Sequence, residues 1–128
     1  YYAFAGAFVH PALQEQWGLV VNEAMACGLP IGVAETVGAA YDLVQDDVNG
    51  YKFDPANVVS MENALTRLAA DPDHRKRMAN SSREIIQSWT PEHFAKHFWA
   101  AVGPPVAEVR VASSSLSCVT AWQFKLGV

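Results

Sequence analysis

The sequence has little of what marks membrane, secreted or nucleic-acid-binding proteins. No stretch reaches the roughly 18 consecutive apolar residues that a transmembrane helix requires, and residues 1–13 lack the basic start and the cleavage site of a signal peptide. Lysine and arginine total 9 against 13 acidic residues, for a net charge of −4. Because nucleic acid is bound by a face with surplus positive charge, this composition argues against nucleic acid as a partner.

Cysteine is also scarce. Cys27 and Cys118 are far apart, and no Cys-x-x-Cys or Cys/His spacing accompanies them, so neither a disulfide framework nor a structural zinc site is indicated. Cys27 falls in a predicted helix, where we expect it to be a small buried hydrophobe. The chain lacks an initiator methionine, and we expect it to be part of something longer.

The residues that are present predict one α/β domain. Of 128 residues, 51% are hydrophobic and 17% charged, enough to bury a core. Short apolar runs at 7–10, 31–34 and 51–53 predict buried strands, while helix-forming segments occupy 19–27, 58–70, 73–89 and 90–102, with a shorter one ending at 44. Strands that alternate with helices indicate a Rossmann-like parallel sheet flanked by helices.

Local signals set the boundaries of these elements. Gly28, followed by Pro30, predicts a helix end, whereas Thr90 as N-cap and Pro91 at the first position predict a helix start. Residues 1–6 resemble the end of a helix, and Asn49-Gly50 predicts a turn with positive φ. In the helix at 58–70 we expect a buried side, made of Val59, Ala64, Leu65 and Leu68.

A change of composition follows residue 102. Gly103-Pro104-Pro105 marks a boundary, and serines become frequent beyond it. We therefore expect a domain at 1–102 and a tail at 103–128 that forms a strand pair or remains loose.

The segment from Glu15 to Glu23 carries the strongest chemical signal. Glu15 lies in the loop after a predicted strand, Gly18 stands where the next helix begins, and Glu23 lies inside that helix. The first N–H groups of a helix, here from Leu19 on, have no intrahelical partner and are well placed to donate to phosphate. A carboxylate accepts hydrogen bonds from the vicinal hydroxyls of a sugar. Two glutamates flanking such a helix start suit a nucleotide sugar.

These residues resemble the Glu-x7-Glu motif of family-4 retaining glycosyltransferases of the GT-B fold. The resemblance extends to Phe8-Val9-His10-Pro11 before the motif and to Glu23-Ala24-Met25-Ala26-Cys27-Gly28-Leu29-Pro30 within and after it. It covers residues 1–102, and it implies the donor-binding C-terminal domain of a carbohydrate-biosynthetic transferase.

The resemblance also implies roles for individual residues. Glu23 matches the glutamate that binds the ribose of the nucleotide, and Glu15 matches the catalytic-site glutamate beside the transferred sugar. Gly18, Leu19 and Val20 match the stretch whose N–H groups face the sugar and the diphosphate. The family transfers a hexose from a UDP-, GDP- or ADP-sugar with retention, without cofactor or metal. A cytoplasmic location follows, or a membrane-peripheral one for the full-length enzyme.

Some features depart from the family pattern. Its acceptor-binding N-terminal domain and its upstream Arg and Lys have no counterpart here, and Lys52 is not at a matching position. Gly6 and Tyr41 stand where Asp and Pro are frequent. We therefore expect this chain alone to bind donor weakly and not to turn over. A sugar-nucleotide epimerase of related fold and a truncated, non-catalytic nucleotide-binding module are the alternatives.

Several other residues have both a structural and a functional interpretation. His10, at a strand end, suits a structural role or a contact with the donor sugar, and Asn22 and Thr36 suit caps or turns better than ligand contacts. The acidic run at 46–50 lacks the ligand spacing of a calcium loop and indicates a surface turn. The basic run at 75–77 indicates a solvated helix face. The aromatic cluster, which we expect to pack in the core or between domains, consists of Trp89, Phe94, Phe98 and Trp99.

Overall fold

The computed structural model describes residues 1–103, and apart from Gly103 the predicted tail lies outside them. Three parallel strands form a sheet in the order β1-β2-β3: β1 (Phe8–His10), β2 (Ile31–Ala34) and β3 (Gly50–Phe53). A single 3-10 turn, η1 (Tyr2–Phe4), precedes β1, where the end of a longer helix was expected.

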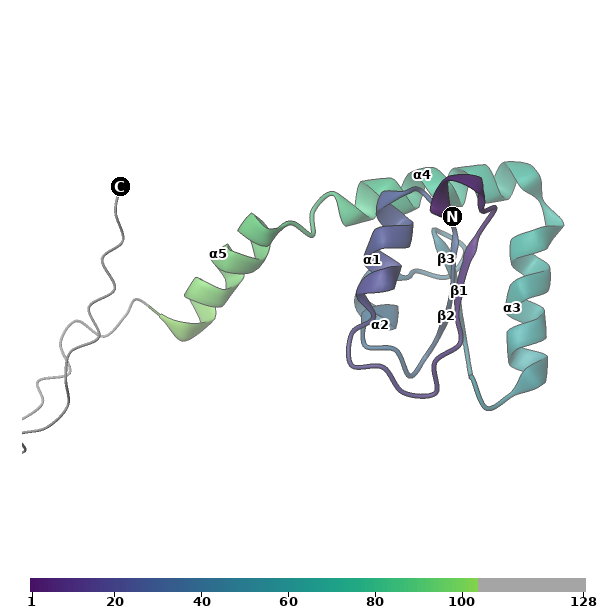
Figure 1. Ribbon diagram of the computed structural model, residues 1–128, viewed down its shortest axis with the longest axis horizontal. Helices are drawn as coiled ribbons and strands as arrows, with labels where there is room; N and C mark the ends of the chain where they lie inside the picture. The colour runs from purple at the N-terminus through teal and green to yellow at the C-terminus, as the bar shows by residue number, and fades with distance from the viewer. Residues whose placement is uncertain (104–128) are drawn as a thin grey trace, which may run out of the picture.

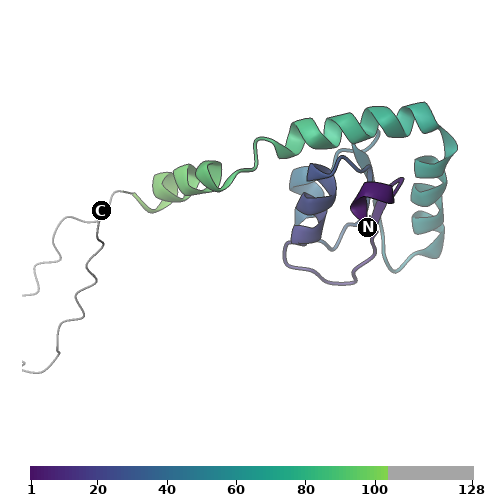
Figure 2. The same ribbon diagram turned by 45° about the horizontal axis from the view of Figure 1, so that its top comes forward.

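The helices cover both faces of this sheet. Figure 1 shows α1 (Leu19–Ala26) and α2 (Ala39–Leu43) on one face and α3 (Val58–Ala70) on the other. Helix α4 (Pro72–Ile86) crosses the end at which the strands begin, and α5 (Pro91–Val102) extends away from the body in both ribbon views (Figures 1 and 2). The predicted Rossmann-like α/β fold is confirmed. Within residues 1–103, no helix has the length and apolar character needed to cross a bilayer.

The core lies between the sheet and its helices. All four residues of β2 are buried, as expected for a central strand that has helices on both faces. The largest fully buried apolar side chains come from five different elements, one from each: Phe53, Met25, Ile31, Leu43 and Met78. Each such side chain contributes about 1.5–3 kcal/mol by leaving water.

Helix α4 closes the amino ends of the strands through polar contacts. The Ser82 hydroxyl donates to the carbonyl of Leu29 at 2.8 Å, and Arg83 donates to the carbonyl of Cys27 at 3.2 Å. Gly28 ends α1 with φ +74°, as predicted, and a Cβ at this position would lie 2.1 Å from the Arg83 guanidinium carbon. The end of α1 and the C-terminal part of α4 are therefore fitted to each other.

Side chains cap the starts of α3, α4 and α5. Asn57, Asp71 and Thr90 each accept hydrogen bonds from backbone N–H groups in the first turn of their helix. The predicted start at Thr90 and Pro91 is confirmed. Such caps typically contribute about 1 kcal/mol each.

Three burial predictions are wrong. Cys27 is exposed, because it is the C-cap of α1 and lies beyond the face that packs on the core. Val59 is 62% exposed and Leu65 38%, since the side of α3 that faces the sheet runs through Met61, Ala64 and Leu68 at helical spacing. No residue of α5 is buried and Trp89, which precedes it, is 41% exposed, so the aromatic cluster does not pack in the core, and packing between domains stays a prediction.

The turn before β3 also differs from expectation. The positive φ falls on Asp47, at 64°, and not on Asn49 or Gly50. Asn49 is fully buried, where its side chain accepts from the N–H of Gln45 and donates to the carbonyl of Leu43. The side-chain amide of Asn49 therefore holds the loop between α2 and β3 together, while the left-handed backbone conformation falls on Asp47.

Candidate functional site

Two loops meet at the carboxyl ends of the strands, the edge at which open α/β sheets bind ligands. The loop after β1 is joined to the loop after β2 by three hydrogen bonds. Thr36 Oγ1 donates to Ala12 O at 2.6 Å, the N–H of Gly38 to Glu15 O at 3.1 Å, and the N–H of Ala39 to Trp17 O at 2.9 Å. A parallel bridge also pairs Glu15 with Val37. The loop that carries Glu15 is thus held by backbone as well as side-chain contacts.

Gly18 lies at the centre of this arrangement. Its φ of 88° and ψ of 65° are left-handed, a conformation that costs an L-residue about 1–2 kcal/mol. A Cβ built on Gly18 would lie 3.0 Å from Val37 Cγ1, 3.4 Å from Glu15 Cγ and 3.7 Å from His10 Cδ2. The structure therefore brings His10 and Glu15 to the same point, at the start of α1.

The start of α1 has no side-chain cap, unlike those of α3, α4 and α5. Its first backbone bond runs from the N–H of Val21 to Gly18 O at 2.9 Å. Within residues 1–103, the N–H groups of Leu19 and Val20 have no acceptor. Free N–H groups at the positive end of a helix are suited to an anion such as phosphate.

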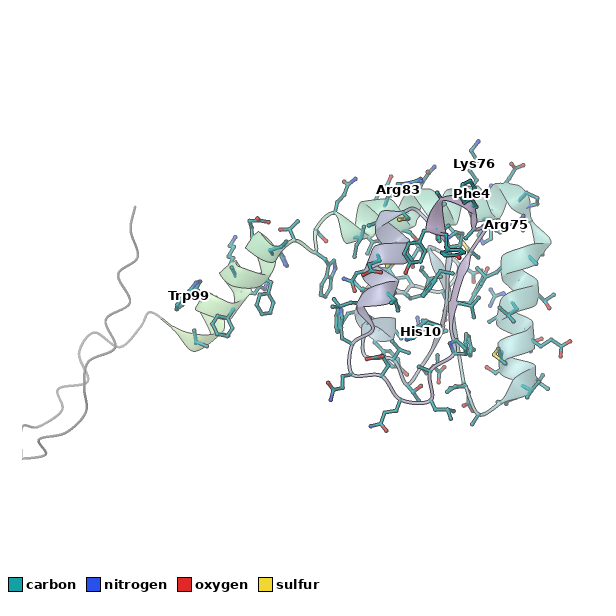
Figure 3. All side chains as sticks on the ribbon, in the orientation of Figure 1. Phe4, His10, Arg75, Lys76, Arg83 and Trp99 are labelled. Carbon is teal, nitrogen blue, oxygen red and sulfur yellow. The ribbon has the colours of Figure 1, made fainter. Side chains whose placement is uncertain are left out.

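The imidazole of His10 adds an unsatisfied polar atom. Its ring stacks on Phe8, with centroids 6.1 Å apart, and its Nε2 is buried without a hydrogen-bond partner among the described residues. A buried nitrogen left unpaired is costly, on the order of 1–3 kcal/mol. Figure 3 places His10 toward the end of the sheet where the two loops lie. A ligand hydroxyl at this position would satisfy it.

Glu23 lies one turn further along α1, in different surroundings. Its side chain is exposed, and its Oε2 accepts a hydrogen bond from the Tyr2 hydroxyl at 3.2 Å. Partial burial, and then the bond to Glu23, raise the pKa of the Tyr2 phenol. Glu23 also lines a cavity of about 490 Å³ together with Arg83 and Ile86. Among the described residues, no hydrogen bond joins the side chain of Glu23 to Glu15 or His10.

The other polar residues considered from the sequence have structural partners. Asn22 accepts a hydrogen bond from Trp17 Nε1 at 3.0 Å, so it orients the loop before α1 and does not cap a helix. Lys52 donates to Val44 O at 2.7 Å. Arg75 donates to the carbonyls of Leu68 and Ala69 at the end of α3, so the basic run is only in part a solvated face.

A second charged group joins the loop before β3 to α3. Arg67 donates to both carboxylate oxygens of Asp47, at 2.7 and 2.8 Å, and lies 4.0 Å over the ring of Tyr51. Hydrogen bonds from Tyr51 and then Arg67 hold the pKa of Asp47 below its usual value. Both carboxylate oxygens of Asp47 are thus occupied, which supports a surface turn over a calcium loop. In residues 1–103, no three His, Cys, Asp or Glu side chains converge on a metal position.

Comparison with known proteins gives consistent similarities. Residues 1–85 match the family described as glycosyl transferases group 1. A D-inositol 3-phosphate glycosyltransferase from Salinispora tropica is 31% identical over 116 residues, which is 91% of this chain and 24% of that protein. A sucrose synthase from Melioribacter roseus is 41% identical over 66 residues, 52% of this chain and 8% of that protein.

Solved structures show the same similarity in three dimensions. A sucrose-phosphate synthase from Thermosynechococcus elongatus superposes with a TM-score of 0.65 at 29% identity, over 79% of this chain and 27% of that one. WaaG, a glycosyltransferase involved in lipopolysaccharide biosynthesis, gives 0.63 at 25% identity, over 78% and 26%. The chain thus spans about a quarter, or less, of the length of these relatives.

Proposed function

This chain belongs to the group 1 glycosyl transferases, retaining family-4 enzymes of the GT-B fold, and we propose that it binds the nucleotide-sugar donor of such an enzyme. The proposal depends on one observation: the start of α1 has no side-chain cap and lies in space next to His10 and Glu15. The donor-binding unit comprises residues 1–102. The acceptor-binding domain is supplied by another part of the full-length protein.

The diphosphate of the donor binds at the free N–H groups of Leu19 and Val20. These groups need no basic side chain to hold an anion, because the helix end itself is positive. Gly18 is required here, since its left-handed backbone turns the chain into α1 without a side chain in the way. The same donors stabilise the departing diphosphate as charge develops on it.

Glu15 and His10 bind the transferred hexose. Glu15 accepts hydrogen bonds from sugar hydroxyls, and it is the catalytic residue in the sense that it contacts the sugar undergoing transfer. The unpaired Nε2 of His10 gains a hydroxyl partner. Transfer proceeds with retention by front-face attack assisted by the leaving phosphate, and it requires no metal. Positioning of donor and acceptor supplies most of the rate enhancement.

Glu23 binds the ribose hydroxyls of the nucleotide. Its Oε2 accepts a hydrogen bond from the Tyr2 hydroxyl at 3.2 Å, and the exposed carboxylate keeps acceptor capacity for further hydroxyl donors, which supports this role. A ribose diol would replace one such bond with two. Hydrogen bonds to a charged group contribute about 1.5–3 kcal/mol, which corresponds to roughly a 10- to 150-fold change in affinity.

Calorimetric titration tests the proposal. UDP, GDP, ADP and the matching nucleotide sugar are added to the full chain and to its Glu23→Ala and Glu62→Ala variants. Glu62 is an exposed glutamate on α3, across the sheet from α1, and serves as the matched control. One nucleotide should bind, about tenfold or more weakly to Glu23→Ala and equally to Glu62→Ala. An equal loss of nucleotide affinity in both variants would contradict the assignment of Glu23, and so would unchanged affinity in both. Conversion of the donor without an acceptor would favour an epimerase-like enzyme.

A further inference from the structure

Helix α5 carries two histidines one turn apart. His93 and His97 are four residues apart, both are exposed, and their ring centroids lie 4.1 Å from each other with an interplanar angle of 32°. The beginning of the helix is well fixed, because Thr90 Oγ1 accepts from the N–H of His93 at 3.1 Å and Pro91 occupies the first turn. The two imidazoles therefore lie on the same face of α5, because residues four positions apart are neighbours on a helix surface.

Both rings line a cavity of about 630 Å³ between the first turns of α5 and the loop before α1. Its walls are aromatic, with Trp17, Trp89 and Phe94, and the rings of Trp17 and Trp89 lie 5.5 Å apart. Among the described residues, neither imidazole hydrogen-bonds to another side chain or to the backbone through its ring nitrogens. Each ring keeps its nitrogens available, and the cavity leaves room beside them.

We propose that His93 and His97 form a two-ligand site for a divalent transition metal such as Zn²⁺, Ni²⁺ or Cu²⁺. Imidazole is a preferred ligand of these ions, and pairs of histidines four residues apart on a helix recur in metal sites. Metal–nitrogen bonds of about 2.0–2.1 Å need one nitrogen of each tilted ring to point at a common position, and rotation about the exposed side chains permits this.

The rest of the coordination sphere opens toward the cavity. Since no third His, Cys, Asp or Glu converges there within residues 1–103, water or a small ligand completes it. Binding is therefore reversible, and it favours imidazole-preferring ions over Mg²⁺, which prefers oxygen. Leu19 lines this cavity and also belongs to the proposed donor site, but neither histidine does, so metal binding is tested separately from the proposed function.

The test is a metal titration of the full chain without an affinity tag. ZnCl2, NiCl2 and CuCl2 are added with calorimetric detection, and MgCl2 serves as the control ion. CuCl2 is also followed by quenching of tryptophan fluorescence, because Trp89 and Trp17 line the same cavity. One metal per chain is expected. His93→Ala and His97→Ala should each weaken binding about a hundredfold, the low end of the gain from joining two binding groups.

Two controls separate the pair from histidine content alone. His74→Ala removes a half-buried histidine that contacts Tyr51 and should leave the affinity unchanged. The double variant His97→Ala with Ala95→His keeps the number of histidines but places the second imidazole on another side of α5, and it should bind as weakly as His97→Ala. Equal affinity in this double variant and the wild type would overturn the proposal, as would the absence of binding to the wild type. Circular dichroism verifies that each variant is folded.

Discussion

Replacing Gly18 by alanine tests how the candidate site is built. The backbone of Gly18 is left-handed, at φ 88° and ψ 65°, which costs an alanine about 1–2 kcal/mol. The new Cβ would also meet Val37 Cγ1 at 3.0 Å. Val37 is only 1% exposed and is held among core residues, so it cannot move away freely. Together these effects should lower the free energy of unfolding by about 2 kcal/mol.

The matched control is Gly6→Ala. Gly6 has no positive φ, and a Cβ there would have nothing within 4 Å. Because a compatible Gly→Ala change restricts the unfolded chain, Gly6→Ala should be neutral or stabilising by up to about 1 kcal/mol.

Urea denaturation followed by circular dichroism measures both variants, and thermal melting should show Gly18→Ala lower by roughly 4–8 °C per kcal/mol. Nucleotide affinity should fall as well, because Gly18 orients the first N–H groups of α1. If Gly18→Ala is as stable as Gly6→Ala, the strained, crowded start of α1 described above is refuted.

Three further predictions concern the core, a charged group and a thiol. Met25→Ala, at a fully buried position, should destabilise the fold by about 2–5 kcal/mol in urea melts; a loss below 1 kcal/mol would mean that α1 is not packed as described. The pKa of Asp47 is lowered in the folded chain, first of all by the hydrogen bond from Tyr51. The ionised carboxylate therefore adds to the free energy of unfolding at pH values above the unfolded pKa of about 3.9, and this stabilisation is lost as pH falls through the lower folded pKa. Asp47→Asn should therefore lower the urea midpoint at pH 7 but much less at pH 3, and a pH-independent difference would exclude this origin. Cys27 is exposed, so in a Cys118→Ser background Ellman's reagent should modify the folded chain without denaturant, and protection until unfolding would contradict its placement.

Local sequence signals predicted the elements of this fold well. Gly28 ends α1 and Thr90 starts α5 because positive φ and capping depend on single residues. The side of a helix that becomes buried depends instead on what packs against it. Val59 is apolar but is turned away from the sheet, and Cys27 lies past the packed face of α1. The buried amide of Asn49 likewise depends on carbonyl and N–H groups that only the folded loop brings near.

Only the features of the candidate site that are local in the sequence could be predicted from it. The spacing of Glu15, Gly18 and Glu23 is a local pattern, and its placement at the start of α1 follows from it. The bonds from Thr36 and Gly38 to the preceding loop join residues more than twenty positions apart, and no local pattern indicates them. The unpaired nitrogen of His10 is a consequence of packing. The spacing of His93 and His97 is visible in the sequence, but the cavity beside them is not.

Backbone amide NMR during nucleotide titration tests the central claim most directly, because it maps binding onto individual N–H groups. UDP, GDP and ADP are added separately to labelled chain, with Glu23→Ala as the control. For one nucleotide, the largest shifts should fall on Gly18, Leu19, Val20 and Glu23, and they should be lost in the variant. A well-dispersed spectrum in which these amides do not move at millimolar nucleotide, or move equally in Glu23→Ala, would contradict a donor site at the start of α1.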